Sequence, residues 1–99
     1  DDIICFGFDA DNNKLYYSQN SNLDPTTANS FTLSDATYTP AGREVSATAA
    51  TNLFNFGNGY FGTTAVTSGN QDDAGYGTFE YDVPTGYYTL NTKNINTYG

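Results

Sequence analysis

Acidic and amide side chains at regular spacing come closest to forming a metal site in this sequence. Asp9, Asp11 and Asn13 match the first three ligand positions of a calcium-binding loop, whose oxygen ligands suit a hard cation. The sixth position of such a loop requires glycine and is Lys14 here, and the twelfth requires a bidentate glutamate and is Asn20. We therefore expect a solvated turn without a metal ion.

A second pair of carboxylates has a spacing that suits glycoside hydrolysis. Glu80 and Asp82 are two residues apart, so on a strand they project from the same face, as paired acids do in glycosidases built on concanavalin-like sandwiches. Retaining enzymes of that fold carry a third acidic residue shortly afterwards, and residues 83–86 contain none. The pair therefore fits the solvated face of a sheet better than a catalytic site.

The sequence offers even fewer suitable residues for other metal or catalytic sites. Asp72 and Asp73 with the nearby Asn70 supply oxygens at too few positions for a cation loop. Because the chain has no histidine, its Ser, Thr and Cys side chains lack their usual general base. The glycine pairs in residues 57–59 and 75–77 predict turns and not a phosphate loop. We expect no enzymatic activity, metal or cofactor.

Aromatic side chains near predicted loops are the remaining candidates for binding. Tyr60, Phe61 and Tyr76 lie in or beside such loops. Tyrosine offers a rigid contact area with a polar tip, which suits recognition of a sugar or a protein. The alternative for each ring is packing over the edge of a sandwich.

The composition indicates which elements position these residues. Sixteen aromatic residues and many Thr, Val, Asn and Gly stand in a single domain of 99 residues, while only 14% of the residues are charged. Strong helix formers are scarce and residues suited to a pleated surface are common. We predict an all-β fold.

The charge balance excludes two classes of partner. The formal net charge is −8, and only Lys14, Arg43 and Lys93 are positive. Nucleic acids and anionic membrane surfaces both require a basic surface, so neither is an expected partner. Cys5 is the single cysteine and lies in an apolar run, where we expect it to act as a small buried hydrophobe.

Local patterns predict several short antiparallel strands. The apolar residues 3–8 and the segment 14–17 predict a hairpin, with Asn12 and Asn13 able to adopt left-handed turn conformations. We expect loops at 18–30 and 67–77 and a polar tail or linker after residue 90. The further expected strands are 37–40, 44–49, 53–57, 79–83 and 87–90.

Alternation along these strands predicts the core and an antiparallel sandwich. Phe54 and Phe56 share one face, and Asn55 points away from it. The side chains expected to be buried are Ile4, Phe6, Phe8, Leu15, Tyr17, Phe54, Phe56, Phe79, Tyr81 and Leu90.

Three segments together resemble SPRY domains. The first is Asp2-Ile3-Ile4-Cys5-Phe6-Gly7-Phe8-Asp9 with Asn12-Asn13-Lys14-Leu15-Tyr16-Tyr17, which is similar to the hairpin of that family. The second is Leu53-Phe54-Asn55-Phe56-Gly57, similar to a later strand ending in Asn-Phe-Gly. The third, Tyr81 with Val83-Pro84-Thr85-Gly86-Tyr87 and Leu90-Asn91-Thr92-Lys93-Asn94, resembles the closing segment of SPRY-like domains in phage tail and fibre proteins.

The resemblance implies a concanavalin-like antiparallel β-sandwich, or jelly roll, that serves as a non-enzymatic structural or recognition module of a phage virion. Such a tail fibre or appendage contacts other virion proteins in an oligomeric assembly, and a host surface glycan or protein is a further partner. The alternative is a stand-alone SPRY-like module that binds protein or carbohydrate. Two departures are Tyr16 in place of the usual tryptophan and an insertion at residues 58–77.

The resemblance also implies that the sandwich is incomplete in this chain. Residues 1–95 correspond to the C-terminal part of such a domain, and residues 96–99 to a tail or linker. Residues 3–8 are apolar on both faces, which a strand tolerates only when both faces are covered. We expect the missing strands to come from elsewhere in the same protein or from neighbouring subunits, and the isolated chain to aggregate or fold poorly.

Overall fold

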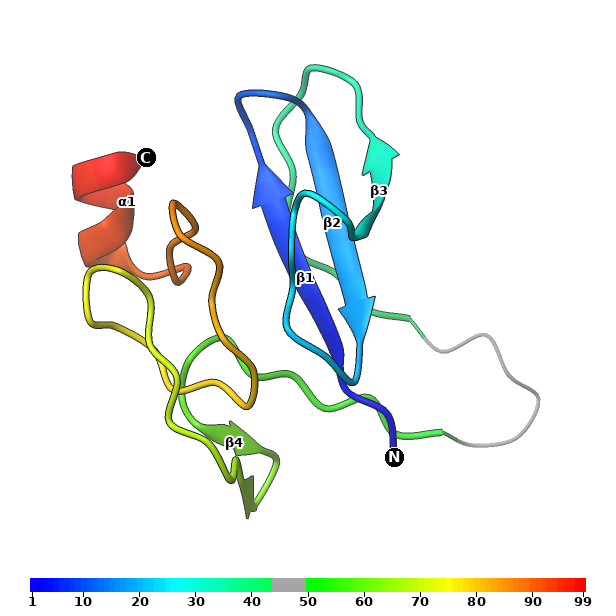
Figure 1. Ribbon diagram of the computed structural model, residues 1–99, viewed down its shortest axis with the longest axis vertical. Coiled ribbons are helices and arrows are strands. Elements are labelled where there is room, and N and C mark those ends of the chain that lie inside the picture. Colours follow the sequence, from blue (N-terminus) through cyan, green and yellow to red (C-terminus); the bar gives the residue numbers. More distant parts are fainter. Residues whose placement is uncertain (44–49) are drawn as a thin grey trace.

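The computed structural model describes residues 1–43 and 50–99 of the chain (Figure 1). In these ranges the strands pair antiparallel and one short helix accompanies them, which agrees with the predicted all-β class. The expected strand at 44–49 lies outside the described residues. The elements are β1 (Ile4–Asp9), β2 (Lys14–Gln19), β3 (Asn29–Thr32), β4 (Tyr60–Phe61), β5 (Thr64–Ala65) and α1 (Thr92–Tyr98).

The predicted hairpin at the start of the chain is confirmed as β1 and β2. The two strands pair antiparallel with Phe6 opposite Tyr17. Asn13 closes the turn with a φ of 52°, a left-handed conformation that asparagine tolerates better than most residues. The carboxylate of Asp9 accepts hydrogen bonds from the backbone and side chain of Asn12, so local polar groups fix the turn.

A third strand, which was not among the expected strands, continues this sheet. β3 pairs antiparallel with β2, giving the order β1-β2-β3. The expected loop 18–30 therefore ends early, and its only deeply buried side chain is Leu23. Phe31 stacks on Tyr17 of β2 with 5.3 Å between ring centroids, so one aromatic pair helps to hold β3 in place.

A two-residue hairpin occurs inside the segment interpreted as an insertion. β4 and β5 pair Tyr60 with Ala65, and the Val66 N–H donates to the Gly59 carbonyl at 2.9 Å. Gly59 has a φ of 82°, which glycine adopts without strain. The Asn58-Gly59 turn signal thus begins a hairpin.

Four expected strands do not form strands in the structure. Residues 37–40, 53–57 and 87–90 are irregular, and in 79–83 only Phe79 makes an isolated bridge, with Asn70. Alternation favours an extended backbone, but a strand also needs a neighbour for its hydrogen bonds. Among the described residues these segments have no such neighbour apart from the single bridge between Asn70 and Phe79.

The expected polar tail forms a helix instead. The side chain of Asn91 accepts a hydrogen bond from the Asn94 N–H, and Gly99 ends α1 through a bond to the Ile95 carbonyl. Asparagine before and glycine after a helix are common boundary signals. Within the described ranges, α1 included, no helix is long and apolar enough to cross a membrane.

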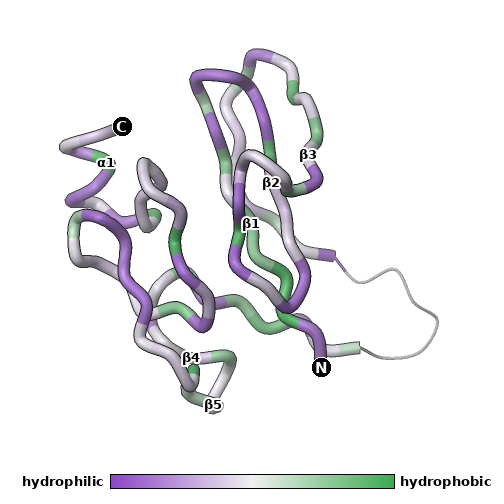
Figure 2. The backbone as a smooth tube through the Cα atoms, viewed as in Figure 1, coloured by the Kyte–Doolittle hydropathy of each residue, from purple (hydrophilic) through white to green (hydrophobic). Residues whose placement is uncertain are grey.

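Many large apolar side chains are exposed, so the predicted core is wrong for six of its ten residues. Leu23, with 6% exposure, is the only large apolar side chain of the described ranges that is buried. Figure 2 shows apolar stretches in β1 and in the segment that follows residue 50. Of the predicted core, Leu15, Tyr17, Phe79 and Tyr81 are half-buried, whereas Ile4, Phe6, Phe8, Phe54, Phe56 and Leu90 are exposed.

Candidate functional site

The two faces of β1 have different neighbours. Gly7 is buried, and a Cβ atom built on it would lie 2.5 Å from Leu23 and 3.0 Å from the ring of Tyr87. Side chains alternate along a strand, so Ile4, Phe6 and Phe8 project from the opposite face. These three are exposed, and Phe6 reaches 65%. β1 therefore presents an uncovered row of large apolar side chains.

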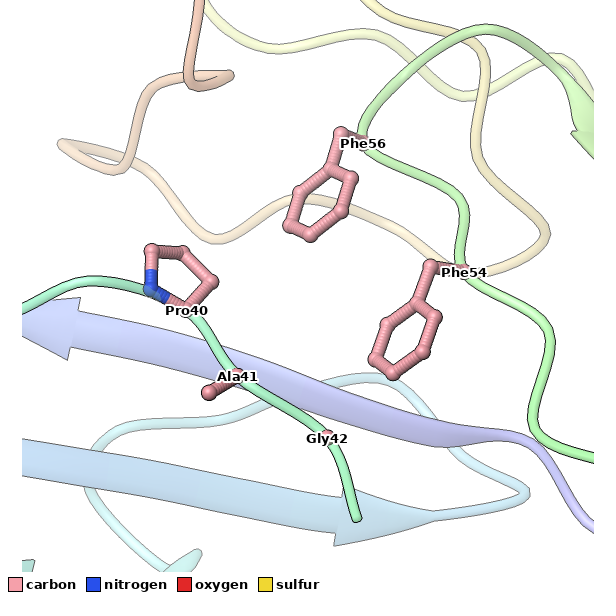
Figure 3. Close-up of a pocket in the computed structure, with 5 residues that line it drawn as sticks. All are labelled: Pro40, Ala41, Gly42, Phe54 and Phe56. Carbon is pink, nitrogen blue, oxygen red and sulfur yellow. The ribbon is translucent and has the colours of Figure 1, made fainter.

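Phe54 and Phe56 add a second group of exposed rings. Their ring centroids are 6.0 Å apart with nearly parallel planes. With residues 40–42 they line a pocket of about 140 Å³, toward which both rings point in Figure 3.

Asn55 lies between these two residues in sequence, and its side chain points into the structure. The prediction had the two rings facing the core and Asn55 pointing away, so the observed orientation is the reverse. Its amide group donates to the Thr78 carbonyl at 3.0 Å, and its carbonyl accepts from the Gly57 N–H at 2.7 Å and the Gly59 N–H at 3.3 Å. The Asn55 side chain satisfies backbone groups of residues 57–59 and of Thr78, which it can do only when it points inward. The phenylalanine rings require only an apolar contact. The polar face is therefore the internal one.

The reversed orientation changes the expected effect of truncating Phe56. Its side chain is 53% exposed, so Phe56→Ala should lower the free energy of unfolding by about 1 kcal/mol or less, far below the about 3–5 kcal/mol of a fully packed ring. Urea denaturation followed by tyrosine fluorescence measures this. A loss of about 3 kcal/mol would show that the ring is packed in solution.

These apolar groups line one large depression, which we call the apolar trough. It has a volume of about 1740 Å³ and runs between β1, residues 38–42, residues 51–56 and residues 79–90. Phe8 contacts Tyr38 edge to face within it, with 5.8 Å between centroids. In Figure 1, β1 forms the side of the sheet that faces residues 79–90. The trough is large enough for an extended segment of protein.

Charges at the ends of β1 are mainly negative. Asp1 and Asp2 precede the strand, Asp9 ends it, and Asp11 follows in the turn; all four line the trough. Arg43 is the one cationic residue among the described residues that line it. A partner with positive charges at both ends of its apolar part would complement this pattern.

The three predicted binding aromatics lie in different places. Tyr60, 48% exposed, and the half-buried Phe61 form β4, and only Phe61 lines the trough. Tyr76 lies in another loop, where the Lys93 ammonium is 5.6 Å from its ring centroid. No ring contact joins these two places in the described part of the chain, so the three residues do not form one site.

Asp72 is buried and organises the loop that contains Tyr76. One carboxylate oxygen accepts from the backbone N–H groups of Ala74 and Tyr76, and the other accepts from the Thr89 N–H and the Asn94 side chain, all at 2.8–3.0 Å. Burial alone raises the pKa of Asp72, but the hydrogen bonds from Tyr76, Thr89 and Asn94 outweigh it and lower the pKa to about 2. The ionised carboxylate thus joins the loop to α1.

The two carboxylates considered for glycoside hydrolysis bind different partners. Glu80 accepts from the backbone and hydroxyl of Thr67, whereas Asp82 accepts from the Asn22 side chain at 2.8 Å. Side-chain and backbone hydrogen bonds from Thr67 lower the pKa of Glu80. A glycosidase acid needs a raised pKa, so this arrangement suits structural roles.

The remaining candidates show no arrangement for chemistry. The described residues contain no cluster of three His, Cys, Asp or Glu side chains positioned for a metal ion. Cys5 is half-buried, and burial raises the pKa of its thiol although a hydrogen bond with Ser18 opposes the shift. A thiol with a raised pKa is a poor nucleophile at neutral pH.

What the geometry provides is therefore a surface for apolar contacts. Of the residues that line the trough, Phe61 is a predicted binding residue, whereas exposed residues such as Phe6, Phe54 and Phe56 were expected in the core. The sequence carried a signal that separates the two cases: too few strands are predicted to cover both faces of residues 3–8, which already led to the expectation of an incomplete sandwich. The chain has no match among family models, curated proteins or solved structures.

Proposed function

We propose that this chain is a non-enzymatic structural module of a phage virion, such as a tail fibre or appendage. In this proposal it forms part of a SPRY-like antiparallel β-sandwich, and other virion protein covers the apolar trough. The observation that carries the proposal is a group of exposed apolar side chains along one trough: Ile4, Phe6, Phe8, Phe54 and Phe56. Soluble monomers rarely leave a surface of this kind uncovered.

Two further observations support the proposal. The three segments that resemble SPRY-like phage proteins include the hairpin that the structure contains, β1 and β2. The carboxylates of Glu80 and Asp82 are each engaged by other side chains, which leaves little for catalysis. A structural role needs none.

A second candidate function is a stand-alone SPRY-like module that binds protein or carbohydrate. The exposed ring of Tyr60 on β4 favours it, because tyrosine suits recognition of a sugar or a protein surface. The same contact would serve a tail fibre that binds a host surface.

Mass spectrometry of purified phage particles tests the proposed function. Trypsin cleaves after Lys14, Arg43 and Lys93, so the peptides 15–43 and 44–93 identify the chain. We expect both in gradient-purified particles, at a constant ratio to a known capsid protein across the particle peak. Peptides confined to particle-free fractions would contradict a virion role and leave the stand-alone module.

A further inference from the structure

The outer edge of β1 carries unpaired backbone groups. The Asn20 N–H donates to the Ile3 carbonyl at 2.8 Å, so this pair is hydrogen-bonded across the hairpin. Hydrogen-bonded and non-bonded pairs alternate in an antiparallel ladder. Ile4, Phe6 and Phe8 therefore occupy the non-bonded positions and direct their N–H and C=O groups away from β2.

The neighbouring strand pair agrees with this assignment. The Leu33 N–H donates to the Asn13 carbonyl at 2.7 Å, which by the same alternation directs the backbone groups of Leu15 and Tyr17 toward β3. These are the residues opposite Phe8 and Phe6. β1 lies at the edge of the sheet, and no described residue bonds the outward groups of Ile4, Phe6 or Phe8.

The residues with outward backbone groups also carry the exposed side chains of β1. A strand laid along this edge would bond the main chain of Ile4, Phe6 and Phe8, and its own apolar side chains on the same face would pack beside theirs. The apolar trough lies beside β1 and supplies space for it. Edge strands that lack charged or proline residues at their centre are templates for addition of another strand.

We propose that the outer edge of β1 is an acceptor site for an extended segment of a different protein chain, which adds as a fourth strand to the β1–β3 sheet. The segment is apolar at alternating positions and has Lys or Arg at its ends. This proposal rests on the proposed function, since it names the contact through which another protein covers the trough.

The negative charges near the ends of β1 favour a different protein chain over a second copy of this chain as the added strand. If two copies paired antiparallel through β1, Asp1 and Asp2 of one copy would lie beside Asp9 and Asp11 of the other, and each copy has a net charge of −8. Like charges across paired strands are destabilising. A strand with cationic ends meets the same carboxylates favourably.

A labelled peptide tests the acceptor site on the 99-residue chain. The probe has the length of β1, alternates Phe or Val with Thr, and carries Lys at each end; a matched probe carries Glu there. We expect fluorescence anisotropy to show binding of the Lys probe that is at least about tenfold tighter than that of the Glu probe at low salt and weakens as NaCl increases.

Proline variants locate the edge that binds. Phe6→Pro removes an outward N–H without breaking a bond to β2, and should weaken binding of the Lys probe by about tenfold. Ser30→Pro is the matched control: Ser30 lies opposite Tyr16 in β3, at a non-bonded position, so it removes an outward N–H at the other edge of the sheet. Binding should change less than about twofold.

Hydrogen exchange tests the site without any variant, and sedimentation tests whether a second copy binds there. Bound probe should slow exchange of the Ile4, Phe6 and Phe8 amides by at least about tenfold and leave Ser30 unchanged. Absence of this protection, or equal losses for Phe6→Pro and Ser30→Pro, would overturn the proposal. So would a dimer in sedimentation that Phe6→Pro dissociates, since it identifies a second copy. If the probe binds at β1 but particles lack the chain, the site stands and the virion role fails.

Discussion

Asp72→Ala is expected to lower the free energy of unfolding by about 3 kcal/mol, one of the two largest stability effects expected in the C-terminal half. The carboxylate is the acceptor for Ala74, Tyr76, Thr89 and Asn94. Alanine leaves these donors without that acceptor in a buried place, and each lost bond there is costly. Urea denaturation monitored by tyrosine fluorescence measures the change.

Asp73→Ala is the matched control for this variant. Asp73 is the exposed neighbour and accepts one bond, from the Gly86 N–H at 3.1 Å, so its loss should cost less than about 1 kcal/mol. Equal losses for the two variants would mean that the buried carboxylate has no special structural role.

The pH dependence of stability gives an independent readout of Asp72. Its pKa is about 2 in the folded chain against an ordinary value of 3.8. A carboxyl with a lowered folded pKa stabilises the fold above its ordinary pKa, and this stability is lost as the pH falls from about 4 to about 2. Asp72→Asn should remove that part of the acid sensitivity, whereas Asp73→Asn should leave it.

Gly77→Ala should be the second large loss, at about 3 kcal/mol. Gly77 has a φ of 88°, which is strained for any residue with a Cβ. That Cβ would also meet the ring of Phe79 and lie 2.7 Å from the Thr89 hydroxyl oxygen. Conformational strain and a steric clash therefore add at one position.

Gly75→Ala separates these two contributions. Gly75 has a similar φ of 79°, and a Cβ there has no atom within 4 Å. We expect a loss of about 1 kcal/mol from strain alone. Thermal unfolding by circular dichroism compares the two variants, and a Gly77→Ala loss no larger than that of Gly75→Ala would show that the 77–89 contact does not form.

Local signals predicted the parts of the fold that depend on neighbouring residues. The hairpin of β1 and β2 follows from an apolar run, the asparagines of the turn and a second strand, all within a short stretch of sequence. Asn91 and Gly99 carried an equally local signal for α1, which the polar composition of that segment concealed. To predict β3, one must know that β2 has a free edge with which it can pair. The sequence pattern of residues 29–32 alone does not contain this information.

The candidate site could not be predicted from hydrophobic periodicity alone, because periodicity does not say which face of a segment is internal. Alternation in residues 53–57 shows that Phe54 and Phe56 share a face, but it does not say which face is internal. The hydrogen bonds of Asn55 to Gly57 and Thr78 decide that. Likewise, Tyr60, Phe61 and Tyr76 were selected one by one for their residue type, and only the tertiary fold separates β4 from the Asp72 loop.

The two borders of the β1–β3 sheet differ in a way that limits how an assembly can grow. β3 is shorter than β1, and all four of its residues are exposed, with Asn29, Ser30 and Thr32 polar. Such a border offers little apolar surface to an incoming strand. Addition is therefore directional: once the β1 side is occupied, the β3 side does not propagate the sheet. The result is a complex of fixed stoichiometry, in contrast to the open-ended fibrils that form when both borders accept strands.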